Sequence, residues 1–129
     1  MKIEHLAIWV KDLEKMRRFY MTYFDMKSNE KYENASKQFT SYFLSFENAE
    51  TRIELMHNPS IVEVMTDNGV EIGLTHFAIS VGSKEKVDQF TTRLRANGFS
   101  IVGEPRTTGD GYYESVVLDC EGNRIEITS

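Results

Sequence analysis

The 129-residue chain lacks the cysteines of a disulfide-bonded protein and the long apolar runs of a membrane protein. Its single cysteine, Cys120, cannot form an internal disulfide, which fits a reducing compartment. No stretch approaches the roughly 18 apolar residues of a membrane span. Glu4 and His5 interrupt the N-terminal apolar run and Lys11-Asp12 end it, so the start does not form a signal peptide. We therefore expect a cytoplasmic protein with no membrane partner.

An excess of positive charge is also missing. The chain has 15 Lys and Arg against 20 Asp and Glu, which gives a net charge of −5. Proteins that follow a nucleic-acid backbone gain affinity by neutralising phosphates, so we expect no nucleic-acid partner. The hydrophobic content of 40% and charged content of 27% are typical of a soluble globular protein, and the length suffices for one domain with a real core.

The chain contains an internal repeat. Residues 5–10 (HLAIWV) and 76–81 (HFAISV) share the pattern His-x-Ala-Ile-x-Val, and residues 52–55 (RIEL) and 124–127 (RIEI) share a second phrase. The period is about 72 residues. The repeat predicts one domain, 1–129, made of module 1 (1–57), a linker (58–71) and module 2 (72–129).

Hydrophobic periodicity predicts the elements of module 1. Alternation predicts a strand over residues 2–10, and its two apolar faces indicate that it is covered on both sides. Asp12 is a candidate N-cap for an amphipathic helix of about 12–13 residues. Three short strands are expected at about 26–33, 38–46 and 51–57.

Module 2 repeats this order. A strand is expected at about 72–82, followed by a helix that Ser83 caps. The segment 97–99 (NGF) predicts a helix end with glycine in the left-handed conformation. The remaining strands are expected at about 100–104, 112–118 and 124–128, with a tight hairpin turn over 119–123.

The two modules carry matching candidate metal ligands. Each has a His in its first strand and a Glu in its last, and a curved sheet would offer both to one hollow. A lone His is more often structural, but an unpaired Glu in an apolar strand is unusual because its burial costs several kcal/mol. His57 has no counterpart and falls on the opposite face, so we interpret it as a surface residue. A pseudo-two-fold arrangement would gather four ligands around one divalent ion: His5, Glu54, His76 and Glu126.

Five phrases occupy residues 3–8, 19–26, 52–55, 73–78 and 119–126. In this order and spacing they resemble the glyoxalase/bleomycin-resistance/dioxygenase superfamily, also called vicinal oxygen chelate proteins, over essentially the whole chain. The resemblance implies an α+β fold in which two tandem β-α-β-β-β modules form a curved, cup-like mixed sheet. It also implies a divalent metal held by the first and last strands. Two positions depart from the family pattern: Asp25 stands where Gly usually ends the helix, and Cys120 where Pro follows Asp.

The two-His, two-Glu set resembles that of glyoxalase I, the lactoylglutathione lyase. The resemblance implies a metal-dependent lyase or isomerase that uses one divalent ion per site, with Zn, Ni, Co, Mn or Fe(II) as the candidates. A carboxylate takes a proton from the carbon next to a carbonyl and returns it to the neighbouring carbon. Glu126 and Glu54 are both candidates for this catalytic base.

The substrate-binding residues differ from those of glyoxalase I. There an Arg four residues beyond the first His holds the glutathione carboxylate, and here that position is Trp9. Trp9 cannot form a bidentate ion pair, so it suggests a more apolar substrate. Asn58 matches an Asn that follows the first Glu, and Tyr112 and Glu114 lie near the site's end of the predicted strand 112–118.

Other activities of the family remain alternatives. An extradiol-type dioxygenase uses two His and one Glu with open positions for oxygen, and Glu54 would fill one of these. Acyl-thioester epimerases need a similar proton abstraction but usually have Gln where Glu54 stands, and metal-dependent antibiotic-modifying transferases use fewer carboxylates. From another class, bleomycin-resistance-type proteins bind a drug without metal, and the intact four ligands count against this interpretation.

We also expect a homodimer. Curved sheets of this size leave edges that must be paired or covered, and closed two-fold dimers are the commonest oligomers. The aromatic strand near 39–46 and the apolar linker residues provide surface for such a contact. The linker residues are Ile61, Val62, Val64 and Met65.

Overall fold

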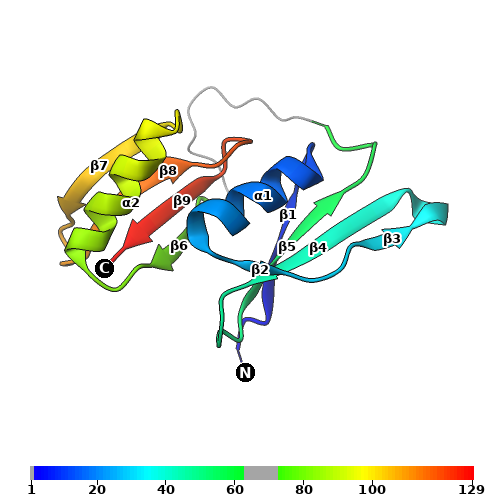
Figure 1. The fold of residues 1–129 in the computed structure, drawn as a ribbon, viewed down its shortest axis with the longest axis horizontal. Helices are drawn as coiled ribbons and strands as arrows, with labels where there is room; N and C mark the ends of the chain where they lie inside the picture. Colours follow the sequence, from blue (N-terminus) through cyan, green and yellow to red (C-terminus); the bar gives the residue numbers. More distant parts are fainter. Residues whose placement is uncertain (1, 63–72) are drawn as a thin grey trace. The chain divides into compact units, whose positions relative to one another are not determined.

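The structure is a computed structural model that describes residues 2–62 and 73–129 (Figure 1). The chain divides into two compact units, Met1–Met65 and Thr66–Ser129. Each unit places one helix against one β-sheet. In the described ranges, no helix is both long and apolar enough to cross a membrane.

The first unit is a β-α-β-β-β module whose first and last strands are neighbours. Its sheet order is β1-β5-β4-β2, with β3 also paired to β4. β1 runs parallel to β5, and the other pairs are antiparallel. The elements are β1 (His5–Trp9), α1 (Leu13–Phe24), β2 (Lys27–Ser28), β3 (Tyr32–Asn34), a 3-10 helix (Ala35–Lys37), β4 (Phe39–Ser45) and β5 (Arg52–His57).

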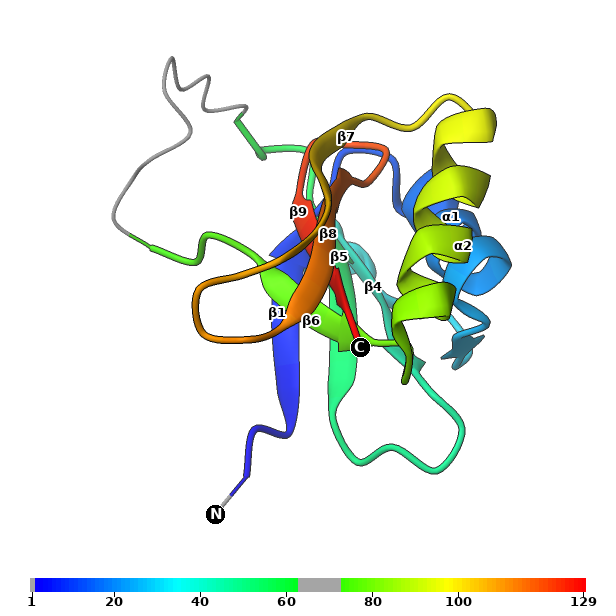
Figure 2. The ribbon, with the colours of Figure 1, turned by 90° about the vertical axis from the view of Figure 1, so that its left-hand side faces the viewer.

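The second unit has the same connectivity, with α2 against one face of its sheet (Figure 2). The sheet order is β6-β9-β8-β7, and β6 runs parallel to β9. Two tandem modules of this kind confirm the predicted α+β, glyoxalase-like fold class. The elements are β6 (Phe77–Ser80), α2 (Lys84–Ala96), β7 (Ile101–Thr107), β8 (Tyr113–Leu118) and β9 (Arg124–Thr128).

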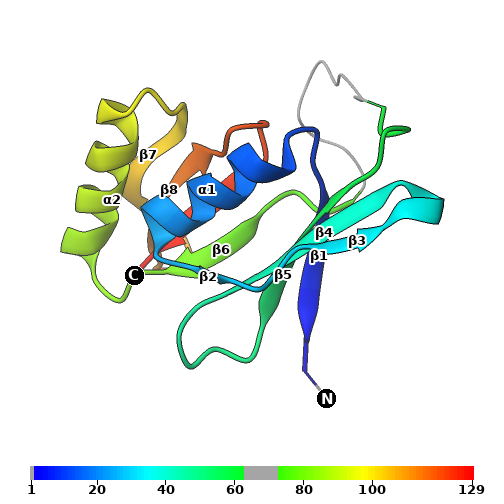
Figure 3. The ribbon, with the colours of Figure 1, turned by 45° about the vertical axis from the view of Figure 1, so that its right-hand side comes forward.

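Each helix buries one face of its own sheet. α1 packs on β2, β4 and β5 (Figure 3), and α2 packs on β7, β8 and β9. Because strand side chains alternate, burying one face of β5 and β9 leaves Glu54 and Glu126 on the other. The fully or nearly buried strand residues toward the helices are Leu44, Ile53, Leu55, Val117, Ile125 and Ile127.

The helix ends follow the predicted capping chemistry. The Asp12 carboxylate accepts a hydrogen bond from the Lys15 backbone N–H at 2.9 Å, and Ser83 accepts one from Lys86 at 3.3 Å. Asp25 ends α1 in the left-handed conformation, with φ of 55°. Gly98, at φ of 84°, ends α2 in the same way. The helices were therefore predicted correctly, and Asp25 does take the place of the usual glycine.

The prediction of one continuous strand over 26–33 is wrong, because this segment forms the two short strands β2 and β3. The Asn29 side-chain oxygen accepts the Phe43 backbone N–H at 2.7 Å. This bond takes a donor of β4 away from the regular ladder, so the strand is interrupted. A 3-10 turn that Asn34 caps then connects β3 to β4.

The predicted strand 72–82 is too long. β6 covers only Phe77–Ser80, because its partner β9 is itself short and the first paired residue is Phe77, opposite Ile125. His76 therefore lies immediately before the strand. β7 in contrast extends to Thr107, past the predicted end near 104, through shifts of register beside Gly103.

Three further predictions concern residues 2–10 and 57–71. The first strand is not covered on both faces, because Trp9 on its His5 face is 53% exposed. His57 is a half-buried residue, not a surface one, since its ring contacts the Val10 carbonyl at 2.9 Å. The linker residues Val64 and Met65, which were expected to supply dimer surface, lie outside the described residues.

Candidate active site

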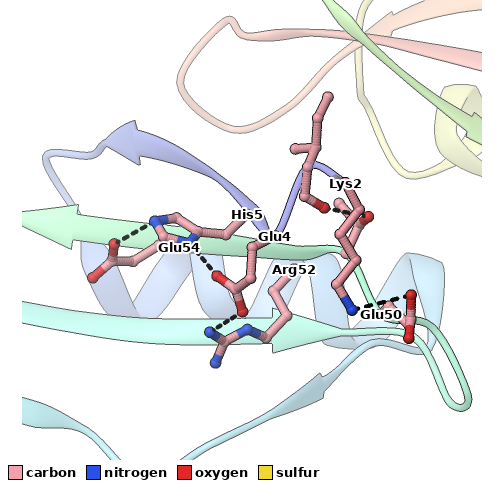
Figure 4. A network of polar contacts seen from close by, with 8 residues as sticks. Lys2, Glu4, His5, Glu50, Arg52 and Glu54 are labelled. Carbon is pink, nitrogen blue, oxygen red and sulfur yellow. Dashed lines mark hydrogen bonds and ion pairs between the residues drawn. The ribbon is translucent and has the colours of Figure 1, made fainter.

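The first unit brings His5 and Glu54 together on the sheet face that α1 leaves open. Ala7 of β1 is paired with Glu54 of the parallel strand β5. His5, two residues before Ala7, therefore lies diagonally beside Glu54 on the same face. The His5 Nε2 and Glu54 Oε2 atoms are 3.7 Å apart (Figure 4).

The second unit builds the same pair at the same register. Ala78 of β6 is opposite Glu126 of β9, and His76 stands two residues before Ala78. The His76 Nε2 and Glu126 Oε2 atoms are 2.9 Å apart. The side chains of Glu54 and Glu126 are only 14% and 17% exposed, so both carboxylates are held within their sheet faces.

A polar network surrounds His5 but was not predicted from the sequence. The Glu4 carboxylate contacts His5 Nδ1 with one oxygen and accepts a hydrogen bond from Arg52 with the other (Figure 4). The Arg52 guanidinium lies 4.0 Å from the centroid of the Phe43 ring, which meets the His5 ring edge-on at 5.3 Å. Two hydrogen bonds lower the pKa of Glu4: the bond to His5 has the larger effect and the bond to Arg52 the smaller.

Glu114 lies beside Glu126 in the second unit. Val116 pairs with Glu126 across β8 and β9, so Glu114 shares that face. Glu114 is only 8% exposed. Its hydrogen bond to Glu126 and its burial raise the pKa of Glu114 to about 7, against the effect of Arg106, whose nitrogen is 3.5 Å away. The position of Glu114 beside a proposed ligand is compatible with the predicted role in substrate binding.

Thr128 adds an unpaired hydroxyl to the same face. It is opposite Glu114 and two residues beyond Glu126. In the described part of the chain, its Oγ1 is the buried side-chain polar atom that has no hydrogen-bond partner. A buried polar group without a partner is costly, and such groups call for an explanation such as a ligand or a functional role.

Trp9 and Asn58 line a hollow in the first unit, with Ser60, Ile61 and Val62. Its volume is about 380 Å³. The Asn58 amide is already engaged: it donates to the Lys37 carbonyl at 3.0 Å and accepts the Ser60 backbone N–H at 2.9 Å. Trp9 thus offers the larger free surface, and Asn58 shapes the rim.

The two tyrosines before Glu114 lie in different places. Tyr112 is exposed in the turn that precedes β8, so it lies outside this strand although the predicted strand 112–118 included it. Tyr113 donates its hydroxyl to Asp88 of α2 at 2.8 Å, and this contact places it on the helix-covered face. Of the two, only Tyr112 stays available to a ligand by its exposure.

Neither His–Glu pair is by itself a complete site for a divalent metal. Across residues 2–62 and 73–129, no three or more His, Cys, Asp or Glu side chains form a group able to hold a metal ion. Two imidazoles and two carboxylates are suitable donors for Zn, Ni, Co, Mn or Fe(II). Either pair alone offers fewer ligands than the three or four that protein sites for these ions use.

The repeated register of a His and a Glu agrees with the relationship seen in sequence comparison. A sequence profile of the Glyoxalase/Bleomycin resistance protein/Dioxygenase superfamily matches residues 2–127. The chain belongs to this superfamily. The matched residues include both modules and both His–Glu pairs.

Relatives within the superfamily include enzymes of the glyoxalase I type. The uncharacterized protein YqjT of Bacillus subtilis (strain 168) is 25% identical over 98% of this chain and 98% of its own length. The lactoylglutathione lyase GLX1 of Arabidopsis thaliana is 28% identical over 95% of this chain, which spans 42% of that enzyme. The crystal structure of glyoxalase I from Zea mays has a TM-score of 0.78 and 25% identity, covering 98% of this chain and 44% of that one. This superfamily member thus spans less than half the length of the two plant enzymes.

Proposed function

We propose that the protein is a metal-dependent lyase or isomerase of the glyoxalase I-like type, acting on a small substrate that chelates a metal through its oxygens. The observation that carries this proposal is the pair of matched His–Glu contacts, one in each module at the same register. One such contact could be structural, but its repetition on open sheet faces favours a common function. In this proposal the two modules form one domain with a single metal centre.

The metal ligands in this proposal are His5, Glu54, His76 and Glu126. A divalent ion held there would polarise the substrate oxygens and stabilise the negative charge that develops on them. The imidazole nitrogens bind as neutral donors, and the carboxylates supply the compensating negative charge. One of the two Glu residues also has to exchange protons with the substrate.

Proton transfer is the step that the chain's own residues carry. A glutamate removes the proton from the carbon next to the carbonyl and returns it to the neighbouring carbon, so the reaction is an isomerisation that neither gains nor loses atoms. Glu126 and Glu54 are both candidates. Glu126 has an additional neighbour in Glu114, whose protonated carboxyl can donate a hydrogen bond to it.

The substrate would carry an apolar or aromatic group. Trp9, on the same face as Glu54, borders the hollow of about 380 Å³ and presents a largely exposed indole. Its ring meets that of Phe39 edge-on at 6.1 Å, so the indole has a fixed aromatic neighbour. An apolar group against this wall is stabilised by burial, whereas a free carboxylate finds no ion-pair partner in Trp9.

The active form is a homodimer in this proposal. The sheets have edge strands that present unpaired backbone groups, and pairing or covering such edges is a general requirement. Exposed apolar side chains such as Val62 and Tyr32 in the first unit supply contact surface. The dimer also offers a second way to combine the His–Glu pairs, by exchange of modules between subunits.

Hydrogen exchange tests the function directly. Metal-loaded protein is incubated in D₂O with hemithioacetals made from methylglyoxal or phenylglyoxal and thiols of different polarity, and the products are followed by NMR. The wild type should form the 2-hydroxy thioester, with the phenyl compounds preferred. Glu54→Gln and Glu126→Gln should each reduce turnover, and the variant that lacks the base should lose it almost completely.

Glu104→Gln is the matched control for these variants. It removes the same charge from an exposed carboxylate that pairs with Arg95 of α2, away from the Glu126 face. Its turnover should equal that of the wild type. A protein that binds the apolar compounds but neither holds metal nor exchanges protons would instead be a metal-independent binding protein of the same fold.

A further inference from the structure

We infer that Glu4 is a positioning residue that, held by Arg52, fixes the His5 ring so that Nε2 is free to bind the metal. The inference rests on the proposed function for the identity of the ligand, but its evidence is the local geometry of the first unit. The internal repeat does not predict this role of Glu4, because Thr75 precedes His76 where Glu4 precedes His5.

The contacts leave only one arrangement of protons for a neutral His5 ring. The Glu4 carboxylate faces His5 Nδ1 with one oxygen and a permanently charged guanidinium with the other (Figure 4). An ionised carboxylate can only accept, so Nδ1 must carry the hydrogen that joins them. The other nitrogen, Nε2, then has a free lone pair, which is the form that binds a metal.

The distance on the other side of the ring agrees with this assignment. His5 Nε2 and Glu54 Oε2 are 3.7 Å apart, which is too long for a hydrogen bond. A lone pair on Nε2 and a carboxylate oxygen then face each other across a gap that a cation can occupy. In the second unit, the 2.9 Å distance between His76 Nε2 and Glu126 has the length of a hydrogen bond.

Backbone hydrogen bonding and ring contacts hold Glu4 and Arg52 in place beside His5. The Arg52 backbone N–H donates to the Glu4 carbonyl at 3.0 Å, so the two residues are fixed to each other by backbone as well as side chain. Phe43 lies under the Arg52 guanidinium and against the edge of the His5 ring, which limits rotation of both. Thus Glu4 and Phe43 contact the His5 ring directly, and Arg52 contacts both of them.

The second module has no counterpart of Glu4 or of Phe43. By register, Val116 stands opposite Glu126 where Phe43 stands opposite Glu54, so no aromatic ring is present there. The contact described for His76 is the one between its Nε2 and the Glu126 carboxylate. The two proposed ligands therefore differ in their described contacts: Glu4 and Phe43 contact the His5 ring, whereas Glu126 contacts that of His76.

The test measures the protonated nitrogen of His5 directly. Long-range ¹H–¹⁵N NMR spectra of metal-free protein distinguish the two neutral forms of each histidine, and zinc affinity is measured by competition with a chelating dye. Wild type should show hydrogen on Nδ1 of His5. Glu4→Gln should give a mixture of forms and weaken zinc binding by about 10- to 100-fold, the usual effect of removing such a partner.

Two controls separate positioning from charge. Glu50→Gln removes a nearby exposed carboxylate that pairs with Lys2 at 3.1 Å and does not touch His5, so it should change neither measurement. Thr75→Ala alters the matching position before His76 and should leave zinc affinity within about twofold, because threonine there lacks the carboxylate that contacts the His5 ring.

The outcomes distinguish this inference from the proposed function. Hydrogen on Nε2 of His5 in the wild type, or unchanged zinc affinity in Glu4→Gln, overturns the role of Glu4. Failure of the wild type to bind any divalent metal overturns the proposed function. In that event the NMR comparison of wild type and Glu4→Gln still decides whether Glu4 fixes the ring.

Discussion

Two threonines in the second unit have buried hydroxyls, and replacing each with valine tests whether the hydroxyl is satisfied by hydrogen bonds. Thr91 Oγ1 contacts the Val87 carbonyl and the Ser115 hydroxyl, both at 2.7 Å, whereas Thr128 Oγ1 has no partner among the described residues. Thr91→Val should lower the free energy of unfolding by about 1–3 kcal/mol, and Thr128→Val should raise it by about 1 kcal/mol. Urea unfolding of the metal-free protein measures both. Loss of stability in Thr128→Val would mean that its hydroxyl is already satisfied.

Trp9 makes a second prediction at this scale, about substrate choice. The hemithioacetal of methylglyoxal and glutathione should be a poor substrate, with kcat/KM below about 10⁴ M⁻¹s⁻¹, because the indole cannot pair with a carboxylate. Trp9→Arg should raise kcat/KM for this compound and lower it for the phenyl compounds. Steady-state kinetics on both proteins measures the change. Efficient turnover of the glutathione compound by the wild type contradicts the prediction.

The sequence predicts some single residues well and others not at all. Each His shares a face with its Glu, as the repeat and the alternation predicted, although the role of the four residues as ligands remains a prediction. The sequence did not single out Glu4 or Thr128, because what their side chains contact depends on side-chain conformation and on cross-strand register. The departure from the repeat at position 4, with Glu4 where module 2 has Thr75, was the one available signal.

At the scale of elements, the two helix ends offer a matched pair of substitutions. Asp25 and Gly98 both end a helix with positive φ, of 55° and 84°. Asp25→Gly should raise the free energy of unfolding by up to about 1 kcal/mol, because glycine adopts this conformation without strain. Gly98→Ala should lower it by about 1–2 kcal/mol from backbone strain alone, since an added Cβ has no atom within 4 Å. Thermal or urea unfolding measures both changes in the free energy of unfolding. Changes of the same sign in the two variants would contradict the shared geometry.

The helices were easier to predict than the strands for a physical reason. Their caps are local, since Asp12 and Ser83 each bond a backbone N–H three residues ahead. A strand depends on its partner, so β6 is limited by the short β9, and the segment 26–33 is divided where Asn29 bonds Phe43. Neither partner can be identified from local sequence.

At the scale of the whole molecule, subunit exchange tests how the modules combine. His5→Ala and His76→Ala proteins are mixed under conditions that allow dimers to exchange, and zinc binding is measured. If each site takes one His–Glu pair from each subunit, a mixed dimer regains one complete site. If all four ligands come from one chain, no mixing restores binding. A monomer by light scattering at micromolar concentration contradicts the proposed dimer.

The central claim is that two His–Glu pairs hold a single ion, and the zinc-to-protein ratio at saturation tests it most directly. Protein is titrated with zinc in the presence of a competing chelator, and the bound metal is measured by atomic emission for the wild type, His5→Ala and His76→Ala. We expect one zinc per chain in the wild type and severe loss in both variants. Two zinc ions per chain with one lost in each variant, or a full complement retained in both variants, would contradict it.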